Sequence, residues 1–459
     1  MKNFSPFQIG VYTVCVIGII FAVLVFSGKI PLGQSSTTSV AGTVTLWGTL
    51  PADAMNQAFA TTSGTYPDLH VVYDQKDPAT MQSDFVNALA SGKGPDLILV
   101  TPADVVRNSD KLLTIPFASL PEQTYVNTFV DEGSLFLNNQ GTVALPLFTD
   151  PMVMYYNRDL LTSAFAVAAP KTWDDVVALN KKMTVKDDAG TLSTETVALG
   201  TYNNIAHAKE MLALLSFQVG NPLVKLDPTL NKYMSQFATV DSSTGASVAT
   251  AFSFYSQFAN PTDADHYSWN ESLPLDTTQF IAGKLGIYFG YASELGSLRA
   301  KNPNLNFGVA MMPQSAHFPN KVTYGQMYGV AVTKISPNQS LAVLVANQMA
   351  TQAFITAYAT LDNTYAPARK DMLSVDTSGD AIKTLVYNSA IISHNWLDPD
   401  PDQTATLFKS YVTNINAGTV QATGLLSDGN SLVQGILDSF QTSSTPSSSS
   451  TTTSTSFGS

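Results

Sequence analysis

The chain has 459 residues, a length at which one hydrophobic core is uncommon, so two lobes or domains are expected. Hydrophobic residues make up 44% of the chain and charged residues only 13%, which is typical of a folded protein and excludes a disordered one. The net charge is -12 at pH 7 and Lys and Arg are not grouped, which argues against nucleic-acid binding because phosphate neutralisation needs clustered cations.

The N-terminal segment predicts a membrane anchor. Lys2 precedes an apolar run from Ile9 to Phe26, about the length that spans a bilayer. The run fits either a signal peptide or an uncleaved anchor. It is long for a signal peptide and no clear cleavage site follows it, so we favour the anchor, with the body outside the cytoplasm. Cys15 lies in this run and is the single cysteine, so neither a disulfide framework nor a cysteine metal site is expected. Residues 1–42 then form the anchor and tether.

After the tether, short apolar runs alternate with helical patterns. Residues 43–47 and 69–73 are expected to be strands, and residues 78–92 a helix that ends at Gly92. The continuous apolar run at 95–100 is typical of a strand covered on both faces. This alternation predicts an α/β fold with a parallel, helix-covered sheet.

The next part of the chain contains a broken apolar run and a second series of elements. The run that starts at Ala144 is interrupted by Asp150 and Pro151 and then resumes. Thr172 followed by Asp175 predicts the capped start of a helix over 170–183. Three further elements are expected: helices over 206–220 and 340–360, and a strand over 283–295 that turns into a helix at Gly290. The Ser/Thr-rich residues 441–459 predict a disordered tail.

Several of these segments, in this order, resemble the extracellular solute-binding proteins of ABC importers, especially the maltose-binding-like type. Each motif is weak alone, but five in the family's order are fairly specific. The match covers roughly residues 43–434. The segments are SDFVNALASGKGPDLILV (83–100), GTVALPLFTDPMVMYYNRDLL (141–161), PKTWDDVVAL (170–179), FIAGKLGIYFGYASEL (280–295), and FGVAMMPQ (307–314) with YGQMYGVAVTKISPNQSLAVLVANQMAT (324–351).

The resemblance implies a two-lobed periplasmic-binding-protein-like fold of type II, with a ligand cleft between lobes that close by a hinge motion. By analogy, the chain crosses between lobes near Asp150, returns near Asn306, and crosses again at the end of the helix 340–360. Proline is tolerable at such a crossing and costly within a sheet, so we expect a hinge edge at Asp150–Pro151. The lobes would comprise 43–150 with 307–360, and 151–306 with 361–440.

Ligands of open α/β sheets bind at the carboxyl ends of strands, which selects most of the candidate binding residues, and residues 202–204 are added as a polar loop. A sugar needs carboxylates or amides for its hydroxyls and flat aromatic rings for its C–H faces. By resemblance, Tyr291 lies on the turn that carries the family's stacking aromatic. Trp173 is expected to be a packed core residue, whereas Trp269 and Trp396 fit either a cleft rim or a loop anchor. The candidates are Trp47, Tyr73, Asp74, Phe148, Asp150, Tyr202, Asn203, Asn204, Gly290, Tyr291 and Tyr328.

The function that the resemblance implies is capture of a small polar solute, with a mono- or oligosaccharide as the leading class, and delivery to ABC permease subunits by a monomer held at the membrane. No cofactor or metal is expected. A surface adhesin that reuses the fold is one alternative. A glycan-active enzyme is another, with Asp74 and Asp150 as the carboxylate pair to test. Residues 398–408 concentrate acids but lack EF-hand spacing, so a solvated loop is expected rather than a calcium site.

Overall fold

The computed structural model describes residues 40–166, 168–188, 191–227, 229–230, 232–373 and 379–443. The predicted anchor lies outside these ranges, and within them no helix is both long and apolar enough to cross a membrane. The chain divides into two compact units, residues 1–43 with 63–70 and residues 44–62 with 71–459. In the described part of the first unit, a 3-10 turn, η1 (Ser63–Thr65), precedes Asp68, whose carbonyl accepts a hydrogen bond from the Gly42 N–H at 3.1 Å.

The main sheet has eleven strands among the described residues, in the order β2-β1-β3-β14-β7-β12-β9-β8, with β13 and β15 paired to β7 and β16 paired to β14. Three pairs of strands are parallel: β1 with β3, β12 with β9, and β14 with β16. Strand β14 runs antiparallel to β3 and β7, and β7 also runs antiparallel to β12, β13 and β15, so the sheet is mixed rather than parallel as predicted. The strands are β1 (Gly42–Gly48), β2 (Leu69–Gln75), β3 (Leu97–Val100), β7 (Ala144–Asn157), β8 (Val185–Lys186), β9 (Leu192–Val197), β12 (Leu285–Tyr291), β13 (Phe307–Met311), β14 (Thr323–Val332), β15 (Ala366–Pro367) and β16 (Ser393–His394).

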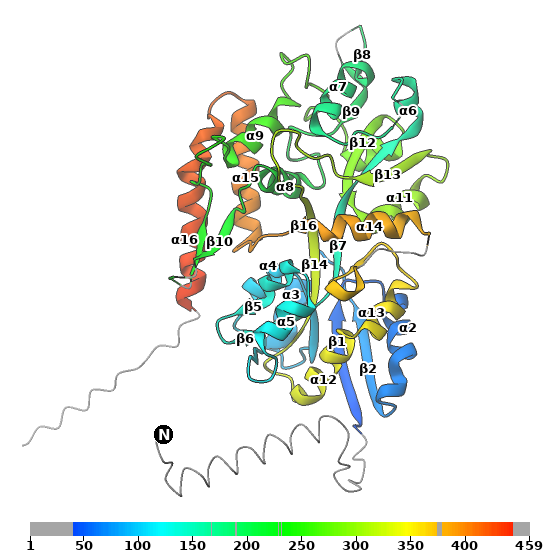
Figure 1. Ribbon diagram of the computed structural model, residues 1–459, viewed down its shortest axis with the longest axis vertical. Coiled ribbons are helices and arrows are strands. Elements are labelled where there is room, and N and C mark those ends of the chain that lie inside the picture. Colours follow the sequence, from blue (N-terminus) through cyan, green and yellow to red (C-terminus); the bar gives the residue numbers. More distant parts are fainter. Residues whose placement is uncertain are drawn as a thin grey trace, which may run out of the picture. The chain divides into compact units, whose positions relative to one another are not determined.

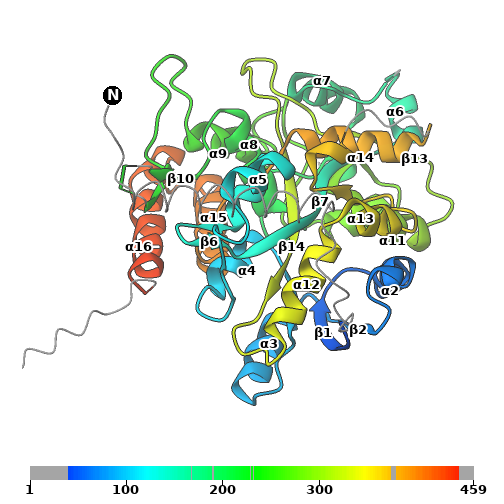
Figure 2. The ribbon, with the colours of Figure 1, turned by 60° about the horizontal axis from the view of Figure 1, so that its bottom comes forward.

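Helices and short elements surround this sheet. Helix α12 packs along β14, and α13 packs against α2 (Figures 1 and 2). The helices are α2 (Ala52–Thr62), α3 (Met81–Ala90), α4 (Pro102–Arg107), α5 (Glu122–Thr128), α6 (Arg158–Ser163), α7 (Trp173–Met183), α8 (Ala208–Gln218), α9 (Val248–Gln257), α10 (Asp276–Ile281), α11 (Leu295–Lys301), α12 (Gln339–Met349), α13 (Gln352–Ala359), α14 (Ala381–Ile391), α15 (Pro401–Asn416) and α16 (Asp428–Ser443). The remaining elements are the 3-10 turns η2 (Asp131–Phe136), η3 (Ala292–Glu294), η4 (Lys370–Met372) and η5 (Ala422–Leu426), and the small strands β4 (Ile115–Pro116), β5 (Leu137–Asn138), β6 (Gly141–Thr142), β10 (Val224–Asp227) and β11 (Lys232–Ser235).

Strand β7 is continuous over fourteen residues, so the predicted interruption at Asp150–Pro151 does not break it. The interruption instead marks a change of partners. Strands β14 and β15 pair with β7 only up to Pro151, whereas β12 and β13 pair with it only from Met152 onward. Proline is tolerated there because two sets of backbone hydrogen bonds meet at this point and neither continues through it. Strand β13 (Phe307–Met311) pairs with the second half, beyond the return expected near Asn306.

The predicted helix starts and stops are confirmed where the sequence carries capping signals. Thr172 accepts a hydrogen bond from the Asp175 N–H at 3.1 Å, and the Asp175 carboxylate accepts one from the Thr172 N–H at 3.0 Å, which forms a capping box at the start of α7. The Asp175 pKa is lowered chiefly by the hydrogen bond from the Lys171 N–H. Gly92 has a φ of 68°, which suits the turn after α3.

Two predicted boundaries were wrong. Residues 340–360 form two helices, α12 and α13, because Thr351 caps a new helix by accepting from the Phe354 N–H at 3.3 Å. Helix α16 continues to Ser443, three residues into the predicted disordered tail.

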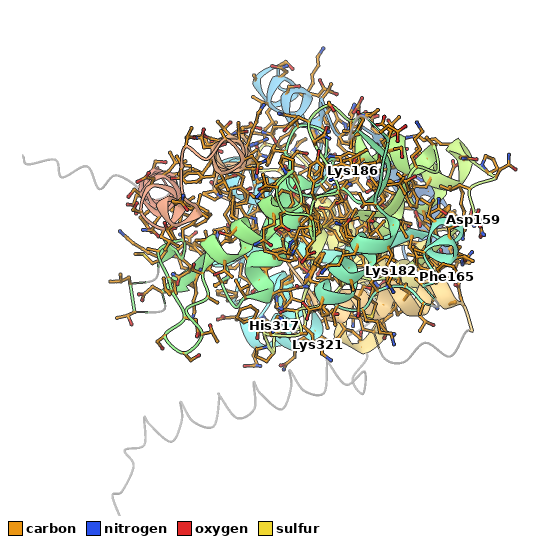
Figure 3. All side chains as sticks on the ribbon, turned by 90° about the horizontal axis from the view of Figure 1, so that it is seen from above. Asp159, Phe165, Lys182, Lys186, His317 and Lys321 are labelled. Atoms are coloured by element: carbon orange, nitrogen blue, oxygen red, sulfur yellow. The ribbon has the colours of Figure 1, made fainter. Side chains whose placement is uncertain are left out.

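Helix α6 ends at an exposed phenylalanine in the left-handed region. Phe165 has a φ of 56° and is 92% exposed. The Ala166 N–H donates to the Leu161 carbonyl at 2.9 Å, which closes the helix as glycine usually does. Figure 3 shows Phe165 at the surface together with Lys182 of α7.

Candidate functional site

Strands β7, β14 and β12 carry polar and aromatic side chains on the face of the sheet that includes Asp150. Side chains alternate along a strand, and directly opposed residues point to the same face, so Asp150 shares a face with its partner Gln326. Tyr328 lies opposite Phe148, and Tyr291 lies opposite Met152, each two residues from Asp150 along β7. The pattern therefore brings Asp150, Gln326, Tyr328 and Tyr291 to one face, and Tyr324, two residues before Gln326, joins them. We call these five residues the crossing face.

Asp150 is a buried carboxyl at the centre of the crossing face. It is 2% exposed, and its Oδ1 accepts a hydrogen bond from the Ser293 N–H of η3 at 3.1 Å. Burial raises the pKa of Asp150, and hydrogen bonds with Ser293 lower it by a smaller amount, so the pKa is about 8. At neutral pH the carboxyl is thus mostly protonated, and a protonated carboxyl can both donate and accept a hydrogen bond.

An ion pair beside the crossing face fixes the turn that carries Tyr291. The Glu294 Oε1 lies 2.7 Å from His207 Nε2 and accepts the Tyr291 N–H at 2.8 Å, while Oε2 accepts from the Tyr288 hydroxyl at 2.6 Å. Burial alone would lower the pKa of His207, but the hydrogen bond and charge of Glu294 raise it to about 9. Burial alone would raise the pKa of Glu294, but His207 lowers it. Both groups are therefore ionised at neutral pH.

Tyr291 itself is half-buried and packs edge-on against the His207 ring, with the ring centroids 5.0 Å apart. Its ring also meets Tyr324 edge-on at 6.5 Å. Gly290 is buried, and a Cβ at this position would lie 2.7 Å from the Tyr288 ring and 2.8 Å from Glu294 Oε1. Any larger residue at position 290 would disturb the hydrogen bonds of Glu294 to Tyr288 and Tyr291, so this position requires glycine.

An aromatic cluster adjoins the crossing face at Tyr328. Tyr328 is half-buried and meets Tyr365 edge-on at 6.0 Å, and Tyr365 in turn meets Tyr358 at 6.1 Å. Phe148 is 0% exposed because it packs between Tyr358, 4.4 Å away, and Tyr365. The structure therefore gives Phe148 the contacts of a core residue and leaves part of Tyr328 accessible.

The predicted binding residues Trp47, Tyr73 and Asp74, on β1 and β2, already contact other groups of the protein. Lys76 Nζ lies 3.9 Å above the Trp47 ring and pairs with the Asp74 carboxylate at 2.5 Å. The Tyr73 hydroxyl donates to the Leu50 carbonyl at 2.7 Å, and burial raises its pKa. Trp47 is half-buried and Asp74 is exposed. Because Lys76 contacts both side chains, a ligand that binds to either of them would also contact Lys76.

Of the predicted loop 202–204, Asn204 has a structural role. Its amide donates to the carbonyls of Asn270 and Leu273 at 2.9 and 3.0 Å, and its oxygen accepts from Thr201 at 2.5 Å and from the Trp269 Nε1–H at 3.1 Å. These four bonds use the whole hydrogen-bonding capacity of an amide.

The two flanking residues of this loop differ from Asn204. Asn203 is exposed and reaches Glu271 only at 3.4 Å. Tyr202 is half-buried, and burial raises the pKa of its hydroxyl. Both retain surface for a ligand.

The remaining tryptophans all lie in the core. Trp173 is 5% exposed and donates its Nε1–H to Gln218 at 2.7 Å, as predicted for a packed residue. Trp269 is fully buried on Asn204, and Trp396 stacks on Phe408 with ring centroids 6.2 Å apart. The structure thus decides the open question for Trp269 and Trp396: both are loop anchors.

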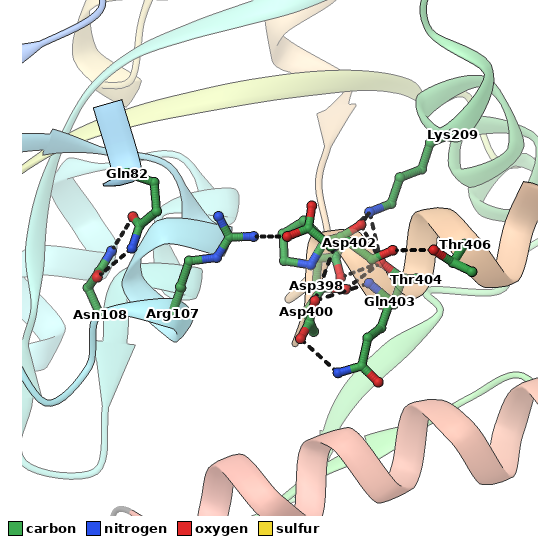
Figure 4. Close-up of polar contacts among 11 residues, drawn as sticks. Gln82, Arg107, Asn108, Lys209, Asp398, Asp400, Asp402, Gln403, Thr404 and Thr406 are labelled. Atoms are coloured by element: carbon green, nitrogen blue, oxygen red, sulfur yellow. Dashed lines mark hydrogen bonds and ion pairs between the residues drawn. The ribbon is translucent and has the colours of Figure 1, made fainter. Parts of the chain in front are cut away.

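In the acidic segment 398–408, Lys209 pairs with one carboxylate and another carboxylate caps helix α15 (Figure 4). Lys209 Nζ pairs with Asp398 at 2.5 Å and also donates to Thr404 at 2.8 Å. Asp400 caps α15, and burial would raise its pKa, but hydrogen bonds from Gln403 and Asp402 lower it. Among the described residues, no group of three or more potential ligands could hold a metal ion. A well-defined helix start takes the place of the predicted solvated loop.

Arg107 at the end of α4 reaches the same segment from a distant part of the chain. Its Nη2 lies 3.3 Å from Asp402 Oδ2, although 295 residues separate the two in sequence (Figure 4). Asp402 is 91% exposed, so the pair contributes little to stability, about 0–1 kcal/mol.

Sequence reasoning did not select three groups at or beside the crossing face: Gln326, Tyr324, and the His207–Glu294 pair. Gln326 and Tyr324 lie in a segment whose resemblance to the family was noted, and only their pairing with β7 shows that they face Asp150. His207 and Glu294 are 87 residues apart, so no local spacing could join them.

Residues 54–385 match the family model described as bacterial extracellular solute-binding protein. This chain belongs to that family. The resemblance inferred from the sequence is therefore confirmed, and the protein is a solute-binding protein that works outside the cytoplasm, not an enzyme.

Solved structures agree on a two-lobed α/β fold. The GacH receptor of Streptomyces glaucescens, solved unliganded and with acarbose, is 16% identical, has a TM-score of 0.64, and the match covers 87% of this chain and 99% of that one. A cyclo/maltodextrin-binding protein complexed with maltotetraose is 14% identical, with a TM-score of 0.66 and coverage of 89% and 99%. A solute-binding protein from Thermotoga lettingae bound with α-D-tagatose is 19% identical, with a TM-score of 0.62 and coverage of 86% and 100%.

Proposed function

We propose that this solute-binding protein captures a neutral mono- or oligosaccharide at the crossing face and delivers it to the permease subunits of an ABC transporter. The observation that carries the proposal is the buried Asp150 carboxyl flanked on one sheet face by the half-buried rings of Tyr291 and Tyr328. Aromatic faces pack against sugar C–H groups, and a carboxyl and the Gln326 amide match sugar hydroxyls.

The charge state of the site favours a neutral ligand. Asp150 is mostly protonated at neutral pH because burial raises its pKa to about 8, and the charges of Glu294 and His207 compensate each other. An anionic ligand would lack an unpaired cation here, and a cationic one would have to ionise Asp150. The proteins of similar structure are named for acarbose, maltotetraose and tagatose, which are carbohydrates or their analogues, and this supports the same class.

Two lobes that close over the ligand form part of the proposal. The change of partners at Pro151 within β7 supports a crossing there, with residues 43–150 in one lobe and 151–306 in the other. The pairing of β13 with the second half of β7 supports a return between Met311 and Thr323. The apolar segment Ile9–Phe26 would hold the protein at the membrane. The protein would act as a monomer.

A thermal-shift screen of the full-length chain in mild detergent tests the ligand class. The library contains maltotetraose, acarbose and tagatose together with polyols, amino acids and peptides. A ligand present at a hundred times its dissociation constant should stabilise the protein by about 2.7 kcal/mol. A clear shift with another class and none with any sugar would remove the carbohydrate proposal, and no shift with any small solute would favour an adhesin.

The site is tested by Tyr291→Ala with Tyr267→Ala as the matched control. Tyr267 is likewise half-buried, but it contacts Lys186 rather than the crossing face. We expect Tyr291→Ala to weaken binding of the sugar found in the screen at least tenfold, and Tyr267→Ala to leave it unchanged. Equal affinities in both variants would place the ligand elsewhere.

A further inference from the structure

A cavity lies beside the edge where β16 pairs with β14, and no residue of the crossing face lines it. It has a volume of about 430 Å³, and its walls come from η2, η4, α14 and β16. Ser393 in its wall pairs with Thr323 of β14. Gly325 makes room for this wall, since a Cβ there would lie 2.6 Å from the Ser393 Cβ.

Glu132 lines the cavity with an incomplete set of partners. The residue is 6% exposed, and its Oε1 is buried without a hydrogen-bond partner. Its Oε2 accepts from the Ser393 hydroxyl at 3.2 Å, but that hydroxyl has one hydrogen and also lies 3.0 Å from the Ala390 carbonyl. The carboxyl thus has a single hydrogen-bond donor, which it shares with the Ala390 carbonyl. A buried polar atom without a hydrogen bond lowers the stability of the folded protein.

The cations around the cavity do not supply the missing partner. Lys370 is held by the Asp131 carboxylate at 2.7 Å and by the Val126 carbonyl at 3.1 Å. Partial desolvation of the ring lowers the pKa of His394, which favours its neutral form. Burial raises the pKa of Glu132 to about 8, as expected for a carboxyl without a cation beside it.

A primary ammonium group matches these requirements. It carries several N–H donors on one compact charge, so it can donate to the Glu132 carboxyl and favour its ionised form. The apolar side chains of Val130, Leu373 and Ile391 line the same cavity and suit a short hydrocarbon chain. The negative net charge of the protein favours a cation over an anion.

We propose that this cavity is a second ligand site, distinct from the crossing face, that takes a small primary amine with its ammonium group bound at Glu132. The site does not depend on the sugar proposal, because none of its lining residues belongs to the crossing face.

Isothermal titration calorimetry on the full-length chain tests this proposal with ethanolamine and 1,4-diaminobutane. Ethylene glycol replaces the amine with a hydroxyl, and tetramethylammonium keeps the charge without any N–H donor. We expect saturable binding of the two amines and none of the two controls. Equal binding of ethylene glycol or of tetramethylammonium, or no binding of either amine, would overturn the proposal.

Two variants locate the binding to this cavity. Glu132→Gln keeps the shape and removes the charge, and should weaken amine binding at least tenfold. Glu195→Gln is the matched control, because Glu195 is also a buried acid with unpartnered oxygens but does not line the cavity. Ile391→Trp fills the cavity from a side chain that is 57% exposed, so it should abolish binding even if Glu132→Gln folds poorly. Unchanged affinity in Ile391→Trp, or an equal loss in Glu195→Gln, would refute the assignment.

Discussion

The protonation of Asp150 gives a prediction on the pH dependence of stability. In the folded protein its pKa is about 8, against an ordinary value of 3.8, so between these two values the folded state binds more protons than the unfolded state. Stability therefore falls as the pH rises through this window. Asp150→Asn keeps an oxygen that can accept the Ser293 N–H but removes the titration, so it should flatten this part of the curve.

The magnitude follows from linkage. One proton per molecule corresponds to about 1.4 kcal/mol per pH unit, so this contribution should change by about 2–3 kcal/mol between pH 5 and pH 7. Glu132 and Glu195 have raised pKa values as well and act in the same direction, but they are present in both proteins and cancel in the difference.

The assay is urea denaturation of ligand-free protein at pH 5, 6 and 7, followed by circular dichroism, for wild type, Asp150→Asn and the control Asp53→Asn. Asp53 is an exposed residue in the first turn of α2. We expect the free energy of unfolding of wild type to fall relative to that of Asp150→Asn as the pH rises, and the Asp53→Asn difference to stay constant. If wild type and Asp150→Asn run parallel from pH 5 to pH 7, the carboxyl is ionised in the folded state and the argument from its burial fails.

Two further predictions concern the turn at Tyr291 and the start of α7. Gly290→Ala should lower the melting temperature and weaken sugar binding because its Cβ would press on Tyr288 and Glu294, whereas Gly296→Ala, with no atom within 4 Å of the added Cβ, should not; equal effects would show that the turn can adapt. Thr172→Ala should cost about 1 kcal/mol in urea denaturation because it removes the side-chain acceptor of the capping box, and an unchanged free energy of unfolding would mean that Asp175 caps α7 by itself.

Local signals in the sequence located several of the strands and helices. The buried run at 95–100 became β3, and the capping residues at Thr172 and Asp175 became the start of α7. Such signals depend on residues a few positions apart, so they can be found without the fold. The break between α12 and α13 was missed because the Thr351 cap lies within an otherwise continuous helical pattern.

The candidate site could be predicted only where it coincides with strand ends. Asp150 and Tyr291 were selected in this way, and both lie on the crossing face. Phe148 was selected by the same rule and Asn204 as part of a polar loop, yet neighbouring rings enclose the Phe148 side chain and hydrogen-bond partners occupy the Asn204 amide. The type of a residue does not tell whether its neighbours leave it exposed.

The sequence by itself determined the alternation of strands and helices, the family, and the importance of the Asp150–Pro151 step, because these depend on residue order and on short-range spacing. Only the tertiary structure decided that β7 continues through the proline, that Gln326 lies opposite Asp150, and that His207 pairs with Glu294. Each of these depends on strand register or on contacts across many residues. Register is set by the packing of the whole sheet, where a shift of one residue turns every side chain to the other face.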